Sequence, residues 1–337
     1  MKKTSIKINF IMNALLTMSS FIFPLITFPY VSRILSPEGT GKVSFANSVI
    51  AYFALFAQLG IPTYGIRACA KVRDNKEELS RTVQEIFIIN MVMTVITYIA
   101  FGITLVYVPR LQTERPLFLI MSTTLLFNAV GLDWLYRGLE KYTYITVRSL
   151  LFKFIALLAM FALIHQKSDY VIYGGISIFA SSASNICNLV NVHQYIQIRP
   201  VGKYQFWRHL KPVMIFFAMS CATTIYTNLD TVMLGFIKTD IDVGYYNAAV
   251  KIKSVLLGIV TSLGTVLLPR ASYYIEHHEM EEFRRITKKA INFVFLIAVP
   301  LNVILSYMRR KEYYFFRGMS ICQQFFLCRL LCRQSYS

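Results

Sequence analysis

The chain has 337 residues, of which 55% are hydrophobic and only 15% are charged, and its mean hydropathy is +0.51. A water-soluble globule of this size could hardly cover so much apolar surface, so the composition predicts an integral membrane protein. The formal net charge of +18 at pH 7 would suit nucleic acid only if the basic residues formed one patch. Their distribution along the chain argues against that class.

Nine apolar runs are long enough to cross a membrane, since a hydrocarbon core of ~30 Å needs about 20 helical residues. The runs cover residues 9–31, 43–65, 83–108, 116–137, 147–165, 170–196, 213–237, 243–268 and 290–307. The first run is longer than a signal-peptide core and lacks a small-residue cleavage site, so we expect a retained helix. Several runs contain polar residues, which predicts an all-α, polytopic bundle of tilted helices rather than isolated anchors.

Lysine and arginine residues alternate between the predicted connections. The N-terminus and the even-numbered connections contain 20 of them, whereas the odd-numbered connections contain six. Those six are Arg33, Lys42, Arg110, Arg115, Lys167 and Lys238. This positive-inside pattern predicts that the N-terminus and the basic loops face the cytoplasm. The basic residues therefore orient the chain, and we expect no nucleic acid among its partners.

Two short stretches recur 203 or 204 residues further along the chain. KEELSR at 76–81 is echoed by MEEFRR at 280–285, and GKVSFAN at 41–47 by GYYNAAV at 244–250. Each second copy lies six spans after the first, so both copies would share one orientation, as in transporters built from parallel lobes. We therefore predict a first six-helix membrane lobe at 1–196, a cytoplasmic inter-lobe linker at 197–212 and a partial second lobe of three helices at 213–307.

The C-terminal sequence changes in character from about Arg309. It reads RRKEYYFFRGMSICQQFFLCRLLCRQSYS, with half of the six cysteines, one acidic residue and no helix-length apolar run. A lipid-facing extension is one interpretation. Most amino acids from Tyr313 onward allow a choice of codons. With a suitable choice, reading from the third base of each codon gives a sequence with a turn followed by an apolar helix. We therefore predict that residues 308–337 are an aberrant, frameshifted tail on a truncated chain.

Three stretches together resemble a known family: FPYVSRILSPEGTGKVSFANSVIAYFALFAQLGIPTYGIR at 28–67, GLDWLYRGLEKYTYITVRS at 131–149 and NLDTVMLGFIKTDIDVGYYNAAVKIKS at 228–254. They are similar to bacterial polysaccharide flippases of the O-antigen and capsule type, which belong to one superfamily with the MATE-like exporters. The resemblance implies two repeated six-helix lobes facing each other in a V, commonly with two further helices. It covers about residues 1–307, and the second lobe of this chain would be incomplete.

The resemblance also implies a function in O-antigen, capsule or exopolysaccharide biosynthesis. Such proteins move an oligosaccharide linked to undecaprenyl pyrophosphate across the bacterial cytoplasmic (inner) membrane by alternating access. Membrane lipids, a polysaccharide polymerase and a chain-length regulator would be its partners. Loss of activity through truncation is an open alternative, as is a cation-coupled multidrug exporter of the same fold. A membrane polysaccharide polymerase is the alternative from another class, although the outer connections are short and carry no catalytic motif.

Charged residues inside or beside the apolar runs are the candidates for a substrate cavity. Asp133 and Arg137 are four residues apart, so on a helix they would lie on one face and neutralise each other. They would form either an interfacial ion pair or part of the mouth of a cavity. Lys153 lies less than two turns inside the next run, where it could line the cavity or extend to the lipid headgroups.

Deeper residues are further candidates. Asp230 and Lys251 should lie at similar depth in neighbouring spans, where they could pair, because isolated charges in hydrocarbon are costly. Arg33, Lys42, Lys251 and Lys253 are the cations expected to line a path for a pyrophosphate headgroup. Roles in topology or helix pairing alone remain open for each. Single scattered cysteines and the pair His277–His278 lack metal-ligand spacing, and we expect neither a cofactor nor a metal.

Overall fold

The computed structural model describes residues 6–197, 199–202, 204–251, 253–254, 279–288, 292 and 295–296. The chain divides into two compact units, Met1–Asn247 and Ala248–Ser337. In the second unit, residues 248–251 and 280–288 are helical. Most of the predicted runs at 243–268 and 290–307, together with the predicted tail at 308–337, lie outside the described residues.

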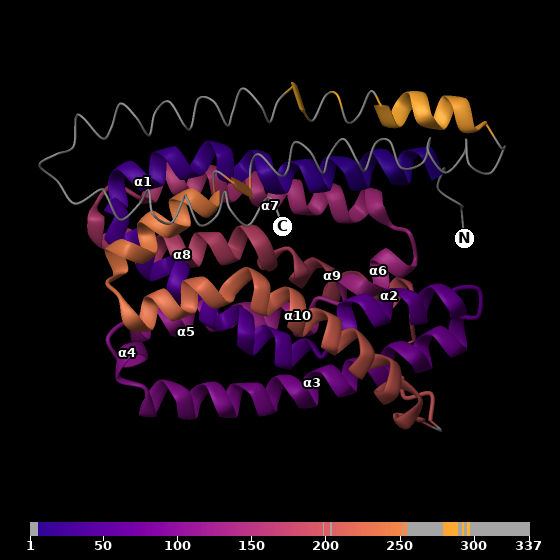
Figure 1. Ribbon diagram of the computed structural model, residues 1–337. Coiled ribbons are helices and arrows are strands. Elements are labelled where there is room, and N and C mark those ends of the chain that lie inside the picture. Colours follow the sequence, from indigo (N-terminus) through magenta and orange to yellow (C-terminus); the bar gives the residue numbers. More distant parts are fainter. Residues whose placement is uncertain are drawn as a thin grey trace, which may run out of the picture. The chain divides into compact units, whose positions relative to one another are not determined.

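The described part of the first unit contains helices and turns but no strand (Figure 1). Its α-helices are α1 (Ile6–Gln58), α2 (Ile61–Val72), α3 (Lys76–Tyr107), α4 (Pro109–Gln112), α5 (Arg115–Val130), α6 (Asp133–Gly138), α7 (Tyr142–Leu163), α8 (Tyr170–Ile178), α9 (Asn185–Asn191) and α10 (Trp207–Ile237). The turns η1 (Lys167–Asp169) and η3 (Val192–Gln194) are 3₁₀-helical, and η2 (Phe179–Ala183) is π-helical. The predicted all-α membrane bundle is confirmed.

Four stretches of the described chain are long and apolar enough to cross a membrane, by length and composition: Ile8–Val72, Lys76–Tyr107, Tyr142–Leu163 and Trp207–Ile237. The outer face of α3 illustrates why, since Val95, Ile99, Ile103 and Val106 are each more than half exposed. In water such an exposed apolar stripe would favour aggregation, whereas in lipid it is the expected surface. The chain is therefore a multi-pass membrane protein.

Helix α1 contains the first predicted span and most of the second, which the structure joins through a kink rather than a loop. Ser36 has φ 61° and ψ 171°, and the next residue is Pro37. A proline disfavours helical geometry in the residue before it, which explains the position of the kink. Leu16 in the first half and Gln58 at the end of the second half line the same cavity, so the two halves fold back on each other.

Two predicted spans are broken by residues with left-handed backbone. Leu59 and Gly60 (φ 45° and 70°) end α1, and Leu132 (φ 44°) separates α5 from α6. The predicted runs 43–65 and 116–137 therefore each consist of two helices. Apolar composition conceals such breaks, because leucine is a strong helix former. The break at Leu132 positions a charged side chain, because it makes Asp133 the first residue of α6.

Close packing holds the short helices inside the bundle. Buried Trp134 of α6 lies against Gly65 of α2, where a Cβ atom would stand 2.6 Å from the indole ring. Trp134 and Tyr136 of α6 belong to a buried cluster that also contains Val83 and Ile86 of α3. Glycine thus lets α2 and α6 approach closely, and α6 is fixed between its neighbours.

Candidate functional site

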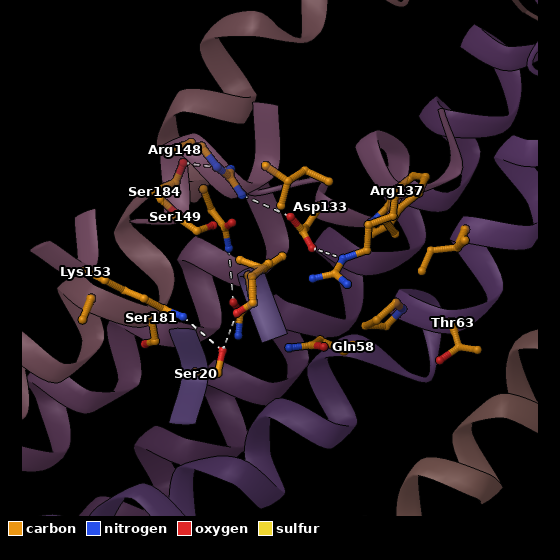
Figure 2. A pocket seen from close by; sticks show the side chains of 18 residues that line it. Ser20, Gln58, Thr63, Asp133, Arg137, Arg148, Ser149, Lys153, Ser181 and Ser184 are labelled. Atoms are coloured by element: carbon orange, nitrogen blue, oxygen red, sulfur yellow. Dashed lines mark hydrogen bonds and ion pairs between the residues drawn. The ribbon is translucent and has the colours of Figure 1, made fainter. Parts of the chain in front are cut away.

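A cavity of about 570 Å³ lies among α1, α2, α5, α6, α7, η2 and α9. Figure 2 shows its polar side chains converging from these elements. The polar and charged residues of its lining are Ser20, Gln58, Thr63, Asn128, Asp133, Arg137, Arg148, Ser149, Lys153, Ser181, Ser184 and Asn185. Three sequence-predicted residues, Asp133, Arg137 and Lys153, are therefore brought together at one site.

Asp133 connects the two arginines of the cavity (Figure 2). Its Oδ2 atom accepts a hydrogen bond from Arg137 Nε at 2.6 Å, and its Oδ1 atom one from Arg148 Nη2 at 3.1 Å. The first pair spans one turn of α6, as the four-residue spacing predicts. The second pair joins α6 to α7, so Asp133 fixes the positions of two guanidinium groups at once.

Arg148 is the most enclosed cation of the cavity, with a side chain only 6% exposed. Besides Asp133 it bonds the carbonyl of Ser184 at 2.9 Å, immediately after the π-helical turn η2. Its Nε atom is buried and has no hydrogen-bond partner within the described part of the chain. A π-helical turn displaces the local backbone from regular helix geometry, which here turns a carbonyl towards α7.

Lys153 lies one helical turn and a residue beyond Arg148 on α7 and reaches towards the first half of α1. Its Nζ atom donates to Ser19 Oγ at 2.8 Å and to Ser20 Oγ at 3.0 Å. Both partners are neutral hydroxyl groups, so they accept from two of the three donors of the ammonium group without cancelling its charge.

The lining therefore contains three cationic side chains and one carboxylate, a formal charge of +2. Uncharged amides and hydroxyls from Gln58, Asn128, Ser149 and Asn185 complete the wall. Positive charge inside an apolar bundle is costly unless it meets water or an anion. The arrangement can accordingly bind an anionic group through charge-assisted hydrogen bonds and a polar group through the amides.

The other predicted residues lie elsewhere. Arg33 is exposed on α1, and Lys42 pairs with Glu38 at 3.2 Å and with Glu114 at 2.9 Å. Asp230 of α10 accepts a hydrogen bond from the hydroxyl of Tyr246 at 2.6 Å.

Lys251 and Lys253 belong to the second unit, where Lys251 is half-buried and Lys253 is exposed. The pairing of Asp230 with Lys251, and the lining of a path by Lys251 and Lys253, stay predictions.

Sequence reasoning did not single out Arg148, because this residue stands at the second position of the predicted run 147–165. The apolar run was placed from residue 147, whereas α7 begins at Tyr142, so Arg148 lies nearly two turns inside the helix. The spacing Arg148-x₄-Lys153 was the available signal, since the two cations follow each other along one helix.

Sequence reasoning also missed a second buried polar centre, at the start of α10. Glu85 of α3 is fully buried, and its Oε2 atom lies 2.6 Å from Arg208 Nη2 and 2.6 Å from His209 Nε2. Its Oε1 atom accepts a hydrogen bond from the backbone N–H of Gln205 at 2.6 Å, and Tyr64 of α2 bonds the other ring nitrogen of His209 at 2.6 Å. The centre binds α2 and α3 to the base of α10.

Residues 6–275 match a model of the family described as "Polysaccharide biosynthesis protein". The chain belongs to this family. The match includes every element around the cavity and the whole of α10. A membrane protein built from long apolar helices, as found here, is what the resemblance of the three quoted stretches implies.

Two curated relatives bear the same description. A "Putative O-antigen transporter" of Escherichia coli (strain K12) is 27% identical over 305 residues, which cover 90% of this chain and 73% of the relative. A "Putative O-antigen transporter" of Shigella dysenteriae is 26% identical over 257 residues, which cover 75% of this chain and 64% of the relative. No solved structure matches the chain.

Proposed function

We propose that this protein transports polysaccharide precursors, as a flippase that moves an oligosaccharide linked to undecaprenyl pyrophosphate across the bacterial cytoplasmic membrane. The observation that carries the proposal is the cavity in which Arg137, Arg148 and Lys153 surround the single carboxylate of Asp133. The pyrophosphate is negatively charged on both phosphoryl groups and cannot enter hydrocarbon unaided. A cavity with a formal charge of +2 offsets the desolvation of this group while the lipid tail remains outside.

The neutral part of the lining suits the saccharide. Asn128, Asn185, Ser149 and Gln58 offer both donors and acceptors, which hydroxyl-rich rings require. Asn185 donates to Asn128 at 3.4 Å, a long hydrogen bond that leaves both amides with free donor or acceptor capacity. The two asparagines bind each other weakly and are therefore available to a polar ligand.

The loop charges support the orientation that this function needs in the membrane. With the N-terminus in the cytoplasm, the start of α1 and the α5–α6 break would lie on the cytoplasmic side, and the cavity would receive its substrate there. The names of the two relatives support a role in O-antigen transport for this chain. A polymerase that consumes the translocated unit and a regulator of chain length are the partners that such a role requires.

A cation-coupled drug exporter and a membrane polymerase are the competing functions. A net positive cavity would repel a cationic drug, which favours the anionic lipid. No observation on the described residues favours the polymerase, and the test separates the flippase from the drug exporter.

The test measures binding and export separately. Purified protein would be titrated with undecaprenyl pyrophosphate and with tetraphenylphosphonium, and export would be scored as surface polysaccharide in cells that lack their own flippase. The variants are Arg137→Gln and Lys153→Gln. The control is Lys167→Gln, which removes an exposed lysine outside the cavity.

We expect both cavity variants to bind undecaprenyl pyrophosphate about tenfold more weakly, since each removes a charge-assisted hydrogen bond. Export should fall without loss of membrane abundance, and Lys167→Gln should behave as the wild type. Tight binding of tetraphenylphosphonium by the wild-type protein, with weak binding of the lipid, would instead support the drug exporter. Unchanged binding of the lipid in both variants would refute the proposed cavity.

A further inference from the structure

Two arginines of the cavity share one counter-charge, the carboxylate of Asp133 (Figure 2). Its Oδ2 atom accepts from Arg137 Nε at 2.6 Å, and its Oδ1 atom accepts from Arg148 Nη2 at 3.1 Å. Each oxygen of the carboxylate therefore binds a different guanidinium group. A phosphoryl group also presents several acceptor oxygens around one atom, so it can bridge the same two arginines when the carboxylate is displaced.

Both arginines keep unused donors while they are bound to Asp133. A guanidinium group can donate from each of its nitrogen atoms. Among the described residues, Arg137 bonds through Nε alone, whereas Arg148 bonds through Nη1 to the carbonyl of Ser184 and through Nη2 to Asp133. The buried Nε atom of Arg148 has no partner in that part of the chain. The carboxylate therefore satisfies only some of the donors that the two arginines offer.

Asp133 and Arg148 differ in their access to the cavity. The side chain of Asp133 is 30% exposed, whereas that of Arg148 is 6% exposed. A guanidinium group buried to this extent needs an anion beside it, because an unpaired buried charge is strongly unfavourable. The carboxylate can therefore turn towards the cavity only when another anion takes its place beside Arg148.

Lys153 is not part of this shared ion pair. Its Nζ atom is bonded to the hydroxyls of Ser19 and Ser20, while Asp133 is bonded to the arginines. A singly charged headgroup that displaces Asp133 from the arginines gains little, because one anion replaces another. A doubly charged headgroup can displace Asp133 with one charged group and meet Lys153, on the wall of the same cavity, with the other.

The bilayer around the protein supplies competing anions. Anionic phospholipids such as phosphatidylglycerol carry a singly charged phosphodiester, and basic protein surfaces attract such headgroups. Without Asp133 the lining would have a formal charge of +3 instead of +2, and it would attract these lipids more strongly. An internal group that competes with the wrong ligand is a general means of achieving specificity.

We propose that Asp133 is an internal counter-anion, which keeps singly charged phospholipid headgroups out of the empty cavity and is displaced by a doubly charged headgroup. In the empty cavity the carboxylate neutralises one charge of the Arg137–Arg148 pair. In the loaded cavity a phosphoryl group does so. That the displacing headgroup is the pyrophosphate of a transported lipid rests on the proposed function, but the exclusion of phospholipid does not.

The experiment counts the phosphatidylglycerol molecules bound to the full chain by native mass spectrometry. The protein is incubated in micelles that contain phosphatidylcholine alone or equal parts of phosphatidylcholine and phosphatidylglycerol. Asp133→Asn removes the charge at nearly constant size, and Asp133→Ser is a second neutral variant in case the first folds poorly. Asp133→Glu restores the charge. Glu140→Gln is the matched control, because it removes a carboxylate from an exposed ion pair outside the cavity.

We expect Asp133→Asn and Asp133→Ser to bind phosphatidylglycerol about tenfold more tightly than the wild type, the factor that one charge-assisted hydrogen bond supplies. Inorganic pyrophosphate should release the additional lipid. Asp133→Glu should bind less of it than Asp133→Asn, and Glu140→Gln should match the wild type.

The unfolding temperature separates this role from a purely structural one. Phosphatidylglycerol should raise the unfolding temperature of Asp133→Asn more than that of the wild type, because the lipid restores an anion beside Arg148. If Asp133 only held α6 against α7, its removal would lower the unfolding temperature and added lipid would not restore it. That result would overturn the inference.

Equal or weaker binding of phosphatidylglycerol by both neutral variants would also overturn the inference. Additional lipid that pyrophosphate does not release would refute the displacement. The proposed function is tested separately, by the lipid titrations of Arg137→Gln and Lys153→Gln. If these two variants bind undecaprenyl pyrophosphate normally while Asp133→Asn takes up phosphatidylglycerol, the proposed function fails and the exclusion of phospholipid stands.

Discussion

Asp133 at the start of α6 and Arg148 within α7 form an ion pair at 3.1 Å that joins two helices at the cavity. The arginine is 6% exposed, whereas the carboxylate is 30% exposed, so the pair is asymmetric in its access to water. Removing the carboxylate would leave the more deeply buried partner without a counter-charge.

We therefore predict that Asp133→Ala lowers the free energy of unfolding by about 2–3 kcal/mol, somewhat less than for a fully buried pair. The control is Glu140→Ala, which removes the partner of Arg73 in an ion pair with side chains 52% and 41% exposed. Such an exposed pair is worth about 0–1 kcal/mol. Thermal unfolding in detergent measures both, and equal losses in the two variants would contradict the prediction.

Gly65→Ala should destabilise the bundle, because the added methyl group would stand 2.6 Å from the ring of Trp134. Overpacking of this kind costs about 1–3 kcal/mol. Gly102→Ala is the matched control, since a Cβ atom at this position on α3 would meet no atom within 4 Å. We expect a lowered unfolding temperature for the first variant and no loss for the second, and the idea fails if the order is reversed.

Binding of undecaprenyl pyrophosphate should weaken as salt is added, because a cavity with a formal charge of +2 attracts the headgroup electrostatically. In Lys153→Gln the charge falls to +1, so we expect a shallower dependence of the dissociation constant on ionic strength. Titrations at several salt concentrations measure the slope. Identical slopes for the variant and the wild type would place the headgroup away from Lys153.

Much of the bundle follows from hydrophobic runs alone, because a helix that faces lipid must be apolar over the whole thickness of the membrane. The positions at which the helices break cannot be predicted from these runs. Leu132 has positive φ although leucine favours helix, and it is tertiary packing around Trp134 that holds the break in place. The local pair of Asp133 and Arg137 could be predicted from a four-residue spacing.

Contacts between distant residues could not be predicted in this way. Glu85 and His209 are 124 residues apart, and neither is unusual in its local sequence. The repeat was visible as two short matches 203 residues apart, but the matches do not reveal that Gly41 and Gly244 face each other's helices. Pairing of distant residues depends on how the helices pack, which periodicity within one helix does not encode.

The connection between α9 and α10 should be among the slowest-exchanging of the described loops. Gln84 of α3 donates to the carbonyls of Gln197 and Arg199 at 2.8 and 2.9 Å, and its oxygen accepts from Tyr204 at 2.8 Å. With Glu85 next to it, α3 thus binds the predicted linker at several of its described residues, from Gln197 to Arg208. A loop held by this many polar contacts opens rarely, and its amides are protected from solvent.

Glu85→Gln should remove that protection, because a neutral amide cannot satisfy both Arg208 and His209 as the carboxylate does. We predict faster hydrogen exchange across residues 197–209 and a stability loss of about 3 kcal/mol, as for a broken buried ion pair. Glu78→Gln, an exposed change on the first turn of the same helix, is the control. Hydrogen exchange measured on peptides by mass spectrometry reports residues 197–209 separately from the first turn of α3. Unchanged exchange at 197–209 in Glu85→Gln would mean that other contacts of α3, such as those of Gln84 and Ser80, are enough to hold the connection.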